Sequence, residues 1–243
     1  MHVIIPARYA ATRLPGKPLR DVAGRPLVVR VLERALASGA TQVVVATDDA
    51  RIAAVVREAG GRAVMTATSH ASGTDRIGEA VRFLGLGDDE IVVNLQGDEP
   101  LMPPALIAQV AQALAANRGW QMATAAHRLH DEAAFQNPHQ VKVVCDDAQR
   151  ALYFSRAPIP WPRSGFGPEG FLGHIGLYAY RVGFIRQFTS WGAGGLERCE
   201  GLEQLRALER GATVGVVLSD RSPGPGVDTE EDLALANTLW TPP

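Results

Sequence analysis

The sequence predicts an α/β fold with a mixed, mostly parallel central sheet flanked by helices. Short β-branched runs alternate with longer stretches of helical periodicity over the first two thirds of the chain, and the connections have crossover length. Such crossovers are right-handed and place ligands at the carboxyl ends of the strands. With 46% hydrophobic and 21% charged residues, the 243-residue chain has the composition of one globular domain, expected to span residues 1–243.

The first strand and helix follow from local sequence. Residues 3–5 are three consecutive β-branched apolar residues, which is typical of a buried strand. A helix is expected to open at Pro26, because the first helical position needs no N–H, and to end at Gly39. A second strand is expected at residues 43–45.

The next two crossings repeat this pattern. The pair Asp48-Asp49 can cap a helix that Gly60-Gly61 terminates. A further helix is predicted from Ser72 to Leu84, followed by a strand at residues 91–93. We therefore expect the strands of this half to be parallel, with their following loops at one edge of the sheet.

The second half is less regular. Strand-like runs at 141–144 and 151–154 are followed by proline-rich and glycine-rich stretches, before a strand at 214–218 and a last helix after Asp228. An insertion over approximately residues 135–210 can carry a second substrate or a subunit contact, and composition alone is equally compatible with a surface excursion.

A dimer contact is expected within residues 150–210. Phe166, Phe171, Phe184 and Trp191 look exposed there, beyond what one layer needs to bury. Aromatic side chains of this kind are enriched where two protein surfaces meet.

Charge and cysteine usage exclude several classes of protein. Twenty-four basic and 26 acidic residues give a net charge of −2 with no basic half, so we expect no nucleic-acid partner. No basic leader precedes the first strand and no stretch reaches about 18 uninterrupted apolar residues, so we expect neither export nor membrane insertion. Cys145 and Cys199 show no disulfide or zinc spacing, which favours a cytoplasmic protein.

The loop after the first strand concentrates positive charge. Arg8, Arg13 and Lys17 lie within residues 6–18, which contain no acid. A loop at the carboxyl end of a parallel strand that offers cations and backbone N–H groups suits a polyphosphate, whereas the alternative is a solvated basic loop. Lys17 is followed by Pro18, so this is not a Walker A loop, and the chain lacks the dinucleotide fingerprint.

Two acids follow the strand at residues 91–93. Successive residues of an extended segment point to opposite sides, so only one of Asp98 and Glu99 can reach a given metal, and we expect Asp98 to do so. Glu99 is then a cap or a backbone anchor. The alternative for Asp98 is to cap the helix expected at Pro103.

Asp228 is the second candidate carboxylate. It precedes an acid-rich helix, so helix capping is the competing interpretation. Two carboxylates on separate loops at one sheet edge could share Mg²⁺ with phosphate oxygens. The spacing in the sequence does not show that Asp98 and Asp228 meet.

Other polar residues are weaker candidates. The loop at residues 70–76 can offer N–H and hydroxyl groups to a base or phosphate, or simply cap a helix. Arg156 and His174 are cations in the irregular region, where an acidic sugar would need partners. The chain has neither a GxSxG nor an HExxH motif, which disfavours hydrolases.

Taken together, the motifs resemble the 3-deoxy-manno-octulosonate (Kdo) cytidylyltransferase family. The resemblance covers nearly the whole chain, and it is the joint occurrence of the motifs that is specific. They are IPARY and TRLPGKP at residues 5–9 and 12–18, ATD at 46–48, SGTDR at 72–76, VNLQGDEP at 93–100, LYFSR at 152–156, PIPW at 158–161, HIGLY at 174–178, LEQLR at 202–206 and GVDT at 226–229.

The resemblance implies a Rossmann-like nucleotidyltransferase fold with an inserted sugar-binding and dimerisation region at approximately 135–210. The implied reaction is CTP plus Kdo giving CMP-Kdo and pyrophosphate for lipopolysaccharide biosynthesis, with Mg²⁺ as cofactor and a homodimer as the assembly. Arg8, Arg13, Lys17, Asp98 and Asp228 would be the catalytic residues, with Asp98 and Asp228 holding the metal.

The resemblance also assigns two sets of binding residues. The nucleotide set comprises Ala7, Arg8, Arg13, Lys17, Ala46, Thr47, Asp48, Ser72, Gly73, Arg76, Gln96 and Gly97. The sugar set comprises Gln96, Arg156, His174, Tyr178, Glu203 and Gln204. Two alternatives remain open: a cytidylyltransferase for another acidic sugar, such as sialic acid or 8-amino-Kdo, and a non-catalytic nucleotide-binding module on the same fold.

Overall fold

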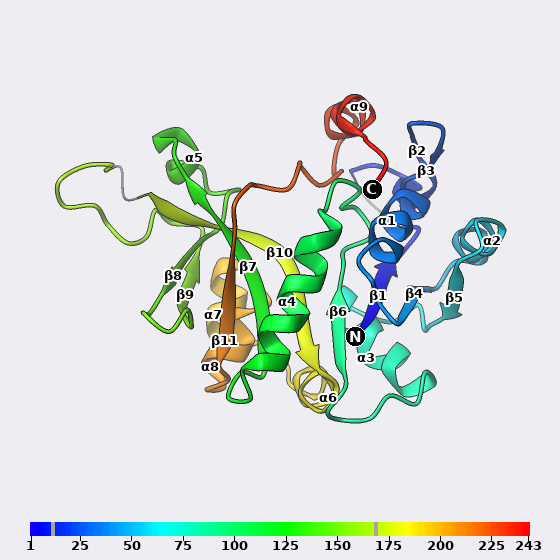
Figure 1. Ribbon diagram of the computed structural model, residues 1–243, viewed down its shortest axis with the longest axis horizontal. Helices are drawn as coiled ribbons and strands as arrows, with labels where there is room; N and C mark the ends of the chain where they lie inside the picture. Colours follow the sequence, from blue (N-terminus) through cyan, green and yellow to red (C-terminus); the bar gives the residue numbers. More distant parts are fainter. Residues whose placement is uncertain (11–12, 168–169) are drawn as a thin grey trace.

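A central sheet organises the molecule (Figure 1). The computed structural model describes residues 1–10, 13–167 and 170–243, so Thr12 of the first motif lies outside the described residues. The strands of the sheet are β1 (His2–Ala7), β4 (Gln42–Thr47), β5 (Arg62–Met65), β6 (Ile91–Asn94), β7 (Met122–Leu129), β8 (Lys142–Cys145), β9 (Ala151–Ser155), β10 (Phe171–Arg181) and β11 (Val214–Ser219).

The strand order confirms a mixed, mostly parallel sheet. Among the described residues the continuous path is β11-β7-β10-β6-β1-β4-β5, with β8 and β9 added beside β10. β1 pairs in parallel with both β4 and β6, and Val3 is in register with Val43, as the sequence predicts for one sheet. β10 runs antiparallel to both of its neighbours, β6 and β7.

The helices form a layer on each face. They are α1 (Leu27–Leu36), α2 (Ala50–Glu58), α3 (Gly73–Phe83), α4 (Pro104–Ala116), α5 (Glu132–Gln136), α6 (Val182–Ser190), α7 (Gly195–Glu200), α8 (Leu205–Glu209) and α9 (Glu230–Leu239), with a 3₁₀ turn η1 at Lys17–Leu19. One hydrophobic cluster joins the sheet to α1, α2 and α4, and a second joins it to α3, α6 and α8. No described helix has the length and apolar character needed to cross a membrane.

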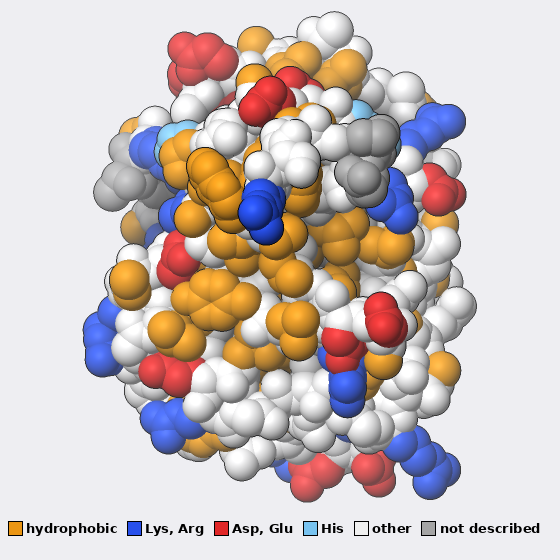
Figure 2. Space-filling view, turned by 90° about the vertical axis from the view of Figure 1, so that its left-hand side faces the viewer, with side chains coloured by type: hydrophobic (Ala, Val, Ile, Leu, Met, Phe, Trp, Pro, Cys, Tyr) orange, Lys and Arg blue, Asp and Glu red, His pale blue; other side chains and the backbone are white. Residues whose placement is uncertain are grey.

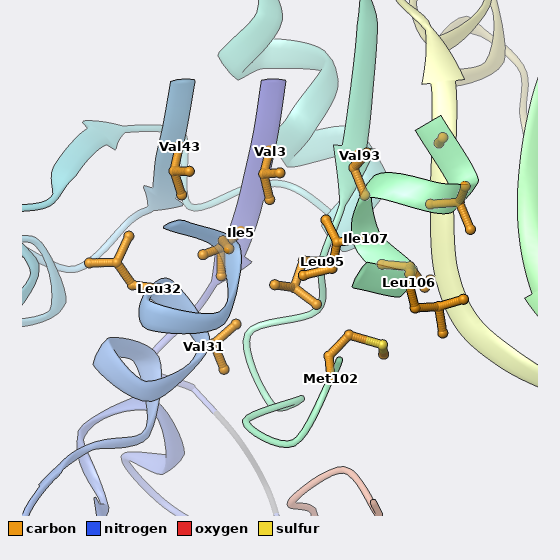
Figure 3. Packing of buried hydrophobic residues seen from close by; sticks show 14 of the residues in the cluster. Val3, Ile5, Val31, Leu32, Val43, Val93, Leu95, Met102, Leu106 and Ile107 are labelled. Atoms are coloured by element: carbon orange, nitrogen blue, oxygen red, sulfur yellow. The ribbon is translucent and has the colours of Figure 1, made fainter. Parts of the chain in front are cut away.

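The first cluster shows how the alternating sequence becomes a core. Figure 3 shows side chains of β1 between α1 and the segment of β6 and α4. Val3 and Ile5 are fully buried there, because alternate strand residues face the same side. The residues labelled around them are Val31, Leu32, Val43, Val93, Leu95, Met102, Leu106 and Ile107.

The connections create a topological switch point between β1 and β6. The chain leaves β1 through α1 on one face to reach β4, and leaves β5 through α3 on the other face to reach β6. After β6 the chain passes through α4 to β7, so the connections that follow β1 and β6 lead toward opposite edges of the sheet. A crevice for ligands is expected at such a point.

The start of α1 differs from the sequence expectation. Pro26 adopts an extended conformation with ψ 140° and is the residue before the helix, which begins at Leu27. The reason is a short hairpin of β2 (Asp21–Val22) and β3 (Arg25–Pro26), in which Pro26 pairs with Asp21. Residues 48–49 behave as predicted, since the Asp49 carboxylate accepts the Arg51 N–H at the start of α2.

A small third cluster lies outside the two main layers. Leu14 of the loop after β1 packs with Val227, which precedes α9, and with Leu233 of α9. Arg30 and Arg34 of α1 lie over the ring of Trp240, with 4.6 and 4.3 Å to its centroid. The C-terminal helix is therefore attached to the part of the chain that carries the cationic loop.

The aromatic residues expected to be exposed pack against other aromatic side chains of the same chain. Phe184 is buried, and Trp191 packs edge-on against it at 5.9 Å between ring centroids. Phe171 stacks on Phe135 at 4.1 Å, and Phe166 lies 5.8 Å from the same ring. The prediction that these aromatics form an exposed surface is wrong: Phe184 is buried, and contacts with neighbouring rings leave Phe166, Phe171 and Trp191 half-buried.

The stacked pair gives a test of this packing. Phe135 is fully buried, so Phe135→Ala should cost about 3–5 kcal/mol of unfolding free energy through lost transfer energy and a residual cavity. Phe83 is 63% exposed, and Phe83→Ala should change stability by about 0.5 kcal/mol or less. Urea unfolding measures both; equal costs would contradict the assignment of Phe135 to the core.

Candidate active site

A cavity of about 410 Å³ opens at the switch point. Its walls come from the loop after β1, the segment before α3, the loop after β6, and the residue two before α9. The structure thus brings together eleven of the residues predicted from the sequence: Ala7, Arg8, Arg13, Lys17, Ser72, Gly73, Arg76, Gln96, Gly97, Asp98 and Asp228.

Lys17 joins the two candidate carboxylates. Its Nζ donates to Asp98 Oδ2 at 2.6 Å and to Asp228 Oδ1 at 3.0 Å, although these partners lie 81 and 211 positions away. Arg13 Nη2 lies 3.0 Å from the other oxygen of Asp228. The structure therefore decides that Asp98 and Asp228 converge on one point.

The charges in this group hold one another in the ionised state. Burial acts to lower the pKa of Lys17, but Asp98 and Asp228 outweigh it and raise the pKa above its ordinary value. Burial likewise acts to raise the pKa of Asp228, and Lys17 and Arg13 bring it below the usual value. The lysine is therefore a cation and Asp228 a carboxylate at neutral pH.

Two close approaches bring the carboxylate loops together. Val227 N–H donates to the Asp98 carbonyl at 2.8 Å, which ties the segment before α9 to the loop after β6. A Cβ on Gly226 would stand 2.9 Å from Glu99 Oε1 and 3.5 Å from the Asp98 carbonyl oxygen. Only glycine lets the chain pass this close without displacing its neighbours.

Neither carboxylate is a helix cap. α4 begins after Pro103 with no side-chain cap, so Asp98 does not serve it. α9 is capped by Thr229 in a capping box with Asp232, and the Asp228 N–H donates to Asp232 Oδ2 at 3.0 Å. The competing interpretation of both residues is wrong, because each carboxylate faces Lys17 instead of a helix end.

The donor set fits a magnesium ion. Asp98 and Asp228 already converge on one cation, the Lys17 ammonium, and they offer only oxygen ligands. Mg²⁺ usually takes one or two carboxylates and completes its shell with water and phosphate oxygens. Among the described residues no group of three His, Cys, Asp or Glu side chains could hold a metal ion.

Glu99 has a different role from its neighbour. Burial, with the nearby Asp98 and Asp228 charges adding to it, raises the pKa of Glu99 to about 8. The carboxyl group faces Gly226 in the segment before α9. Sequence alternation separates Asp98 from Glu99, but it does not indicate that Glu99 becomes half-buried against the segment before α9.

Glycines let the loops after β1 and β6 touch the start of α3. A Cβ on Gly97 would lie 2.7 Å from the Pro6 carbonyl oxygen, and one on Gly73 would lie 3.1 Å from Pro6 Cγ. Ser72 caps α3 through the Asp75 N–H at 3.1 Å, with Asp75 completing the capping box. The cavity wall here is therefore backbone and small side chains.

Ala46, Thr47 and Asp48 of the predicted nucleotide set are not among the residues that line the cavity. Ala46 and Thr47 are fully buried in β4 and do not line the cavity. Asp48 is held by Arg76, whose Nη2 donates to Asp48 Oδ2 at 2.8 Å, while Nη1 donates to Thr66 at 2.5 Å. In this structure Asp48 connects to the cavity through Arg76.

Most of the predicted sugar set forms a polar group beside the start of α3. Tyr178 OH donates to Gln204 Oε1 at 3.2 Å, and Thr74 Oγ1 donates to Glu203 Oε2 at 2.5 Å. Glu203 Oε1 and Gln204 Nε2 are buried and have no hydrogen-bond partner among the described residues. An acceptor and a donor therefore stand side by side for a polar ligand.

His174 is not the cation that the sequence suggested. Burial lowers its pKa to about 3, so the ring is neutral at neutral pH. The ring shares a hydrogen bond of 2.9 Å with Thr124 and meets Phe154 edge-on at 5.0 Å. His174 can therefore donate or accept a hydrogen bond, but it does not match a carboxylate by charge.

Arg156 is oriented by groups that the sequence did not single out. Its Nε donates to the Glu200 carbonyl at 2.8 Å and its Nη1 to the Pro138 carbonyl at 3.1 Å. Lys142 is fully buried and donates to the Arg156 carbonyl at 2.7 Å. The sequence signal for the buried Lys142 is its position between Val141 and Val143 in a predicted strand, since a lysine is seldom found in such an apolar run.

The neutral His174 predicts how stability depends on pH. A histidine whose folded pKa lies below its unfolded value of 6.5 contributes stability above pH 6.5, which is lost as the pH falls toward 3. Between pH 7 and 5.5, wild type should lose about 1 kcal/mol more than His174→Gln. Urea unfolding at both pH values measures this; equal losses would place the ring in contact with solvent.

Comparison with known proteins agrees with this geometry. A family model described as cytidylyltransferase matches residues 2–214. The 3-deoxy-manno-octulosonate cytidylyltransferase of Hahella chejuensis is 53% identical over 239 residues, covering 95% of this chain and 94% of the relative. The protein of the same name from Cellvibrio japonicus is 52% identical over 247 residues, covering 98% and 97%.

A solved structure extends the likeness to three dimensions. CMP:2-keto-3-deoxy-manno-octonic acid synthetase complexed with CTP superposes with a TM-score of 0.91 at 40% identity, covering 98% of this chain and 96% of that one. The sheet order, the cavity at the switch point and these sequence identities lead to one conclusion. The chain belongs to the cytidylyltransferase family, and within it to the 3-deoxy-manno-octulosonate cytidylyltransferases.

Proposed function

We propose that this protein transfers CMP from CTP to the anomeric C2 hydroxyl of Kdo, giving CMP-Kdo and pyrophosphate for lipopolysaccharide biosynthesis. The observation that carries the proposal is the meeting of Lys17 with Asp98 and Asp228 in a cavity at the switch point. The relatives that bear this name, and the similar synthetase complexed with CTP, support it.

The cationic loop acts on the triphosphate. Arg8, Arg13 and Lys17 line one side of the cavity, where they would bind the phosphates and stabilise charge that moves onto the leaving pyrophosphate. Each charge-assisted hydrogen bond of this kind contributes about 1.5–3 kcal/mol. Backbone held by Gly97 and the start of α3 would position the α-phosphorus for in-line attack.

Asp98 and Asp228 would hold Mg²⁺ together with substrate oxygens. When bound there, the ion supplies a lower pKa for the attacking hydroxyl and orients it toward phosphorus. The charges of the two carboxylates balance those of the ion. Lys17 and Arg13 pair with Asp228 in this structure, and with the ion bound they would be able to contact the phosphates instead.

The remaining assignments follow from position. Ser72, Gly73, Arg76 and Gln96 border the cavity and would surround the nucleotide. Arg76 also holds Asp48, and Ala46 and Thr47 are buried in the adjoining strand β4. Glu203 and Gln204 would bind sugar hydroxyls with their free oxygen and amide nitrogen. Arg156 remains the cation for the sugar carboxylate, with Tyr178 and neutral His174 beside the ring.

A pyrophosphate-release assay tests this function. CTP with Kdo should give turnover, whereas UTP, ATP, sialic acid and 8-amino-Kdo define the selectivity for base and sugar. Lys17→Ala should lower kcat/KM by about 10-fold or more, because one charge-assisted contact to the phosphates is lost. The exposed Arg57→Ala on α2 is the matched control, since the other lysine is buried.

No turnover of wild type with any acidic sugar would overturn the proposed function. Equal kcat/KM for Lys17→Ala and Arg57→Ala would instead remove Lys17 from the catalytic group. CTP binding without turnover would favour a nucleotide-binding module on the same fold.

The carboxylates give a sharper prediction. Asp98→Asn and Asp228→Asn should each lower kcat by about 100-fold or more at saturating Mg²⁺, with stability little changed because neither residue caps a helix. The double variant should lose little more than either single variant, since both groups serve one ion.

Thr229→Ala is the control for these variants. Loss of its cap should cost about 1 kcal/mol of stability and leave kcat of the folded protein near wild type. Thermal unfolding and turnover separate the two effects. An Asp98→Asn or Asp228→Asn protein with wild-type turnover would remove that residue from the metal site.

We also propose a cytoplasmic homodimer whose contact lies within the region at 135–210. Both cysteines are free thiols, which suits a reducing compartment. On the face that carries β8, β9 and the loop after them, hydrophobic side chains gather in the middle of the surface (Figure 2). Trp161 is 77% exposed and Leu152 on β9 is 59% exposed.

Light scattering tests the dimer. Wild type should have the mass of two chains at micromolar concentration, and Leu152→Glu or Trp161→Glu should shift it to one chain, because a charge would be buried in an apolar contact. Phe83→Glu on α3 removes an equally exposed aromatic outside this region and should leave the mass unchanged. A monomeric wild type would contradict the proposal.

A further inference from the structure

One hydrogen bond joins the nucleotide side of the site to the sugar side. Thr74 Oγ1 donates to Glu203 Oε2 at 2.5 Å across 129 positions of the chain. Thr74 lies in the first turn of α3, directly after Ser72 and Gly73, which line the cavity. Glu203 lies in the turn before α8, next to Gln204.

The two oxygens of Glu203 have different surroundings. Oε2 receives the Thr74 hydroxyl, whereas Oε1 is buried without a hydrogen bond, and Arg206 Nη2 stands 3.5 Å from it. Arg206 is committed elsewhere, since its Nε and Nη2 donate to the Glu197 carboxylate at 2.7 and 2.6 Å. One oxygen is thus fixed by the protein, and the other is left to accept from a ligand.

Several charged and titratable groups face this carboxyl. Burial raises the pKa of Glu203 and outweighs the lowering by the Thr74 and Ser72 hydroxyls and by Arg206, while Asp75 adds to the increase. Burial and then Glu203 also raise the pKa values of Tyr178 and Tyr180, which stay neutral. The Thr74 hydroxyl is therefore one of the few groups that favour the ionised carboxylate.

We propose that Thr74 is a positioning residue for Glu203: its hydroxyl orients Oε1 toward a hydroxyl of the acidic sugar and ties that orientation to the cavity wall at residues 72–73. This inference rests on the proposed function. The Thr74 hydroxyl donates to Glu203 Oε2, so in this proposal it acts through Glu203 and not by contact with substrate. Sugar binding should depend on this hydroxyl, whereas CTP binding should not.

Two substitutions separate the hydroxyl from the rest of the side chain. Thr74→Val removes the donor and keeps the shape, whereas Thr74→Ser keeps the donor and removes a methyl group. Thr74→Val should raise the KM for the sugar about 10-fold, which is one hydrogen bond to a charged group. Thr74→Ser should stay close to wild type, and calorimetry should give the same Kd for CTP in all three proteins.

A control variant at Thr189 and a second variant at Thr74 distinguish loss of the hydrogen bond to Glu203 from a general effect on the structure. Thr189 on α6 donates only to carbonyls of its own helix, so Thr189→Val removes a threonine hydroxyl without touching Glu203 and should leave the KM for the sugar unchanged. If Thr74→Val does not accumulate as folded protein, Thr74→Ala removes the same donor with less crowding.

Two further readouts test whether the effect passes through Glu203. Loss of a donor to the carboxylate raises its pKa, so the acid limb of kcat/KM for the sugar should move to higher pH in Thr74→Val and return in Thr74→Ser. In a Glu203→Gln background, Thr74→Val should have little additional effect on KM, because the residue through which it acts has been changed.

The outcomes distinguish this inference from the proposed function. If wild type turns over Kdo but Thr74→Val has an unchanged KM, or Thr74→Ser fails as badly as Thr74→Val, the positioning role is overturned and the function stands. An equal loss of CTP affinity, or additive effects of Thr74→Val and Glu203→Gln, would overturn it as well. If wild type turns over no acidic sugar, the proposed function and the positioning role of Thr74 are both overturned.

Discussion

The site depends on one contact, the double hydrogen bond from Lys17 to Asp98 and Asp228. It joins loops from the beginning, middle and end of the chain, so it forms only when the sheet, the β1 loop and α9 are all in place. The Val227–Asp98 backbone bond and the Leu14–Val227–Leu233 cluster provide that support. Burial alone would disfavour the charges of Lys17 and Asp228, but their attraction keeps both ionised.

Two other arginines, Arg76 and Arg206, form buried ion pairs that stabilise the fold. Arg76 is almost fully buried, with donors directed at Asp48 and Thr66, and Arg206 is held in a bidentate pair with Glu197. Removing one partner of such a pair would leave a buried charge uncompensated. Arg8 and Arg13 instead lie on the open side of the cavity. The difference in surroundings separates cations that shape the site from cations that can meet a substrate.

The nucleotide and sugar sides are physically connected. Close approaches at Gly73 and Gly97 press the start of α3 and the β6 loop against Pro6, and the Thr74–Glu203 bond continues this contact toward Tyr178 and Gln204. β10 makes this possible, because it lies between β6 and β7 and brings Tyr178 opposite Asn94 at the end of β6, with the His174 ring 5.5 Å from the Tyr178 ring. An enzyme that joins two substrates needs such a connection to hold both reacting atoms in one geometry.

The sequence by itself determined the buried strands β1, β4 and β6 and the helices between them, since periodicity and capping are local, but it did not indicate β2, β3 or β5. It also supplied the motifs that bring Lys17, Asp98 and Asp228 into consideration. It could not determine that these three side chains meet, that Thr229 rather than Asp228 caps α9, or that α1 begins after Pro26. Nor could it determine that His174 is half-buried and neutral. Each of these depends on contacts between distant segments: the pairing of β2 with β3, the seating of α9, and the insertion of antiparallel β10. The local sequence pattern indicates which roles a residue can take. Burial and neighbouring charges decide which of those roles it does take, and both depend on the tertiary structure.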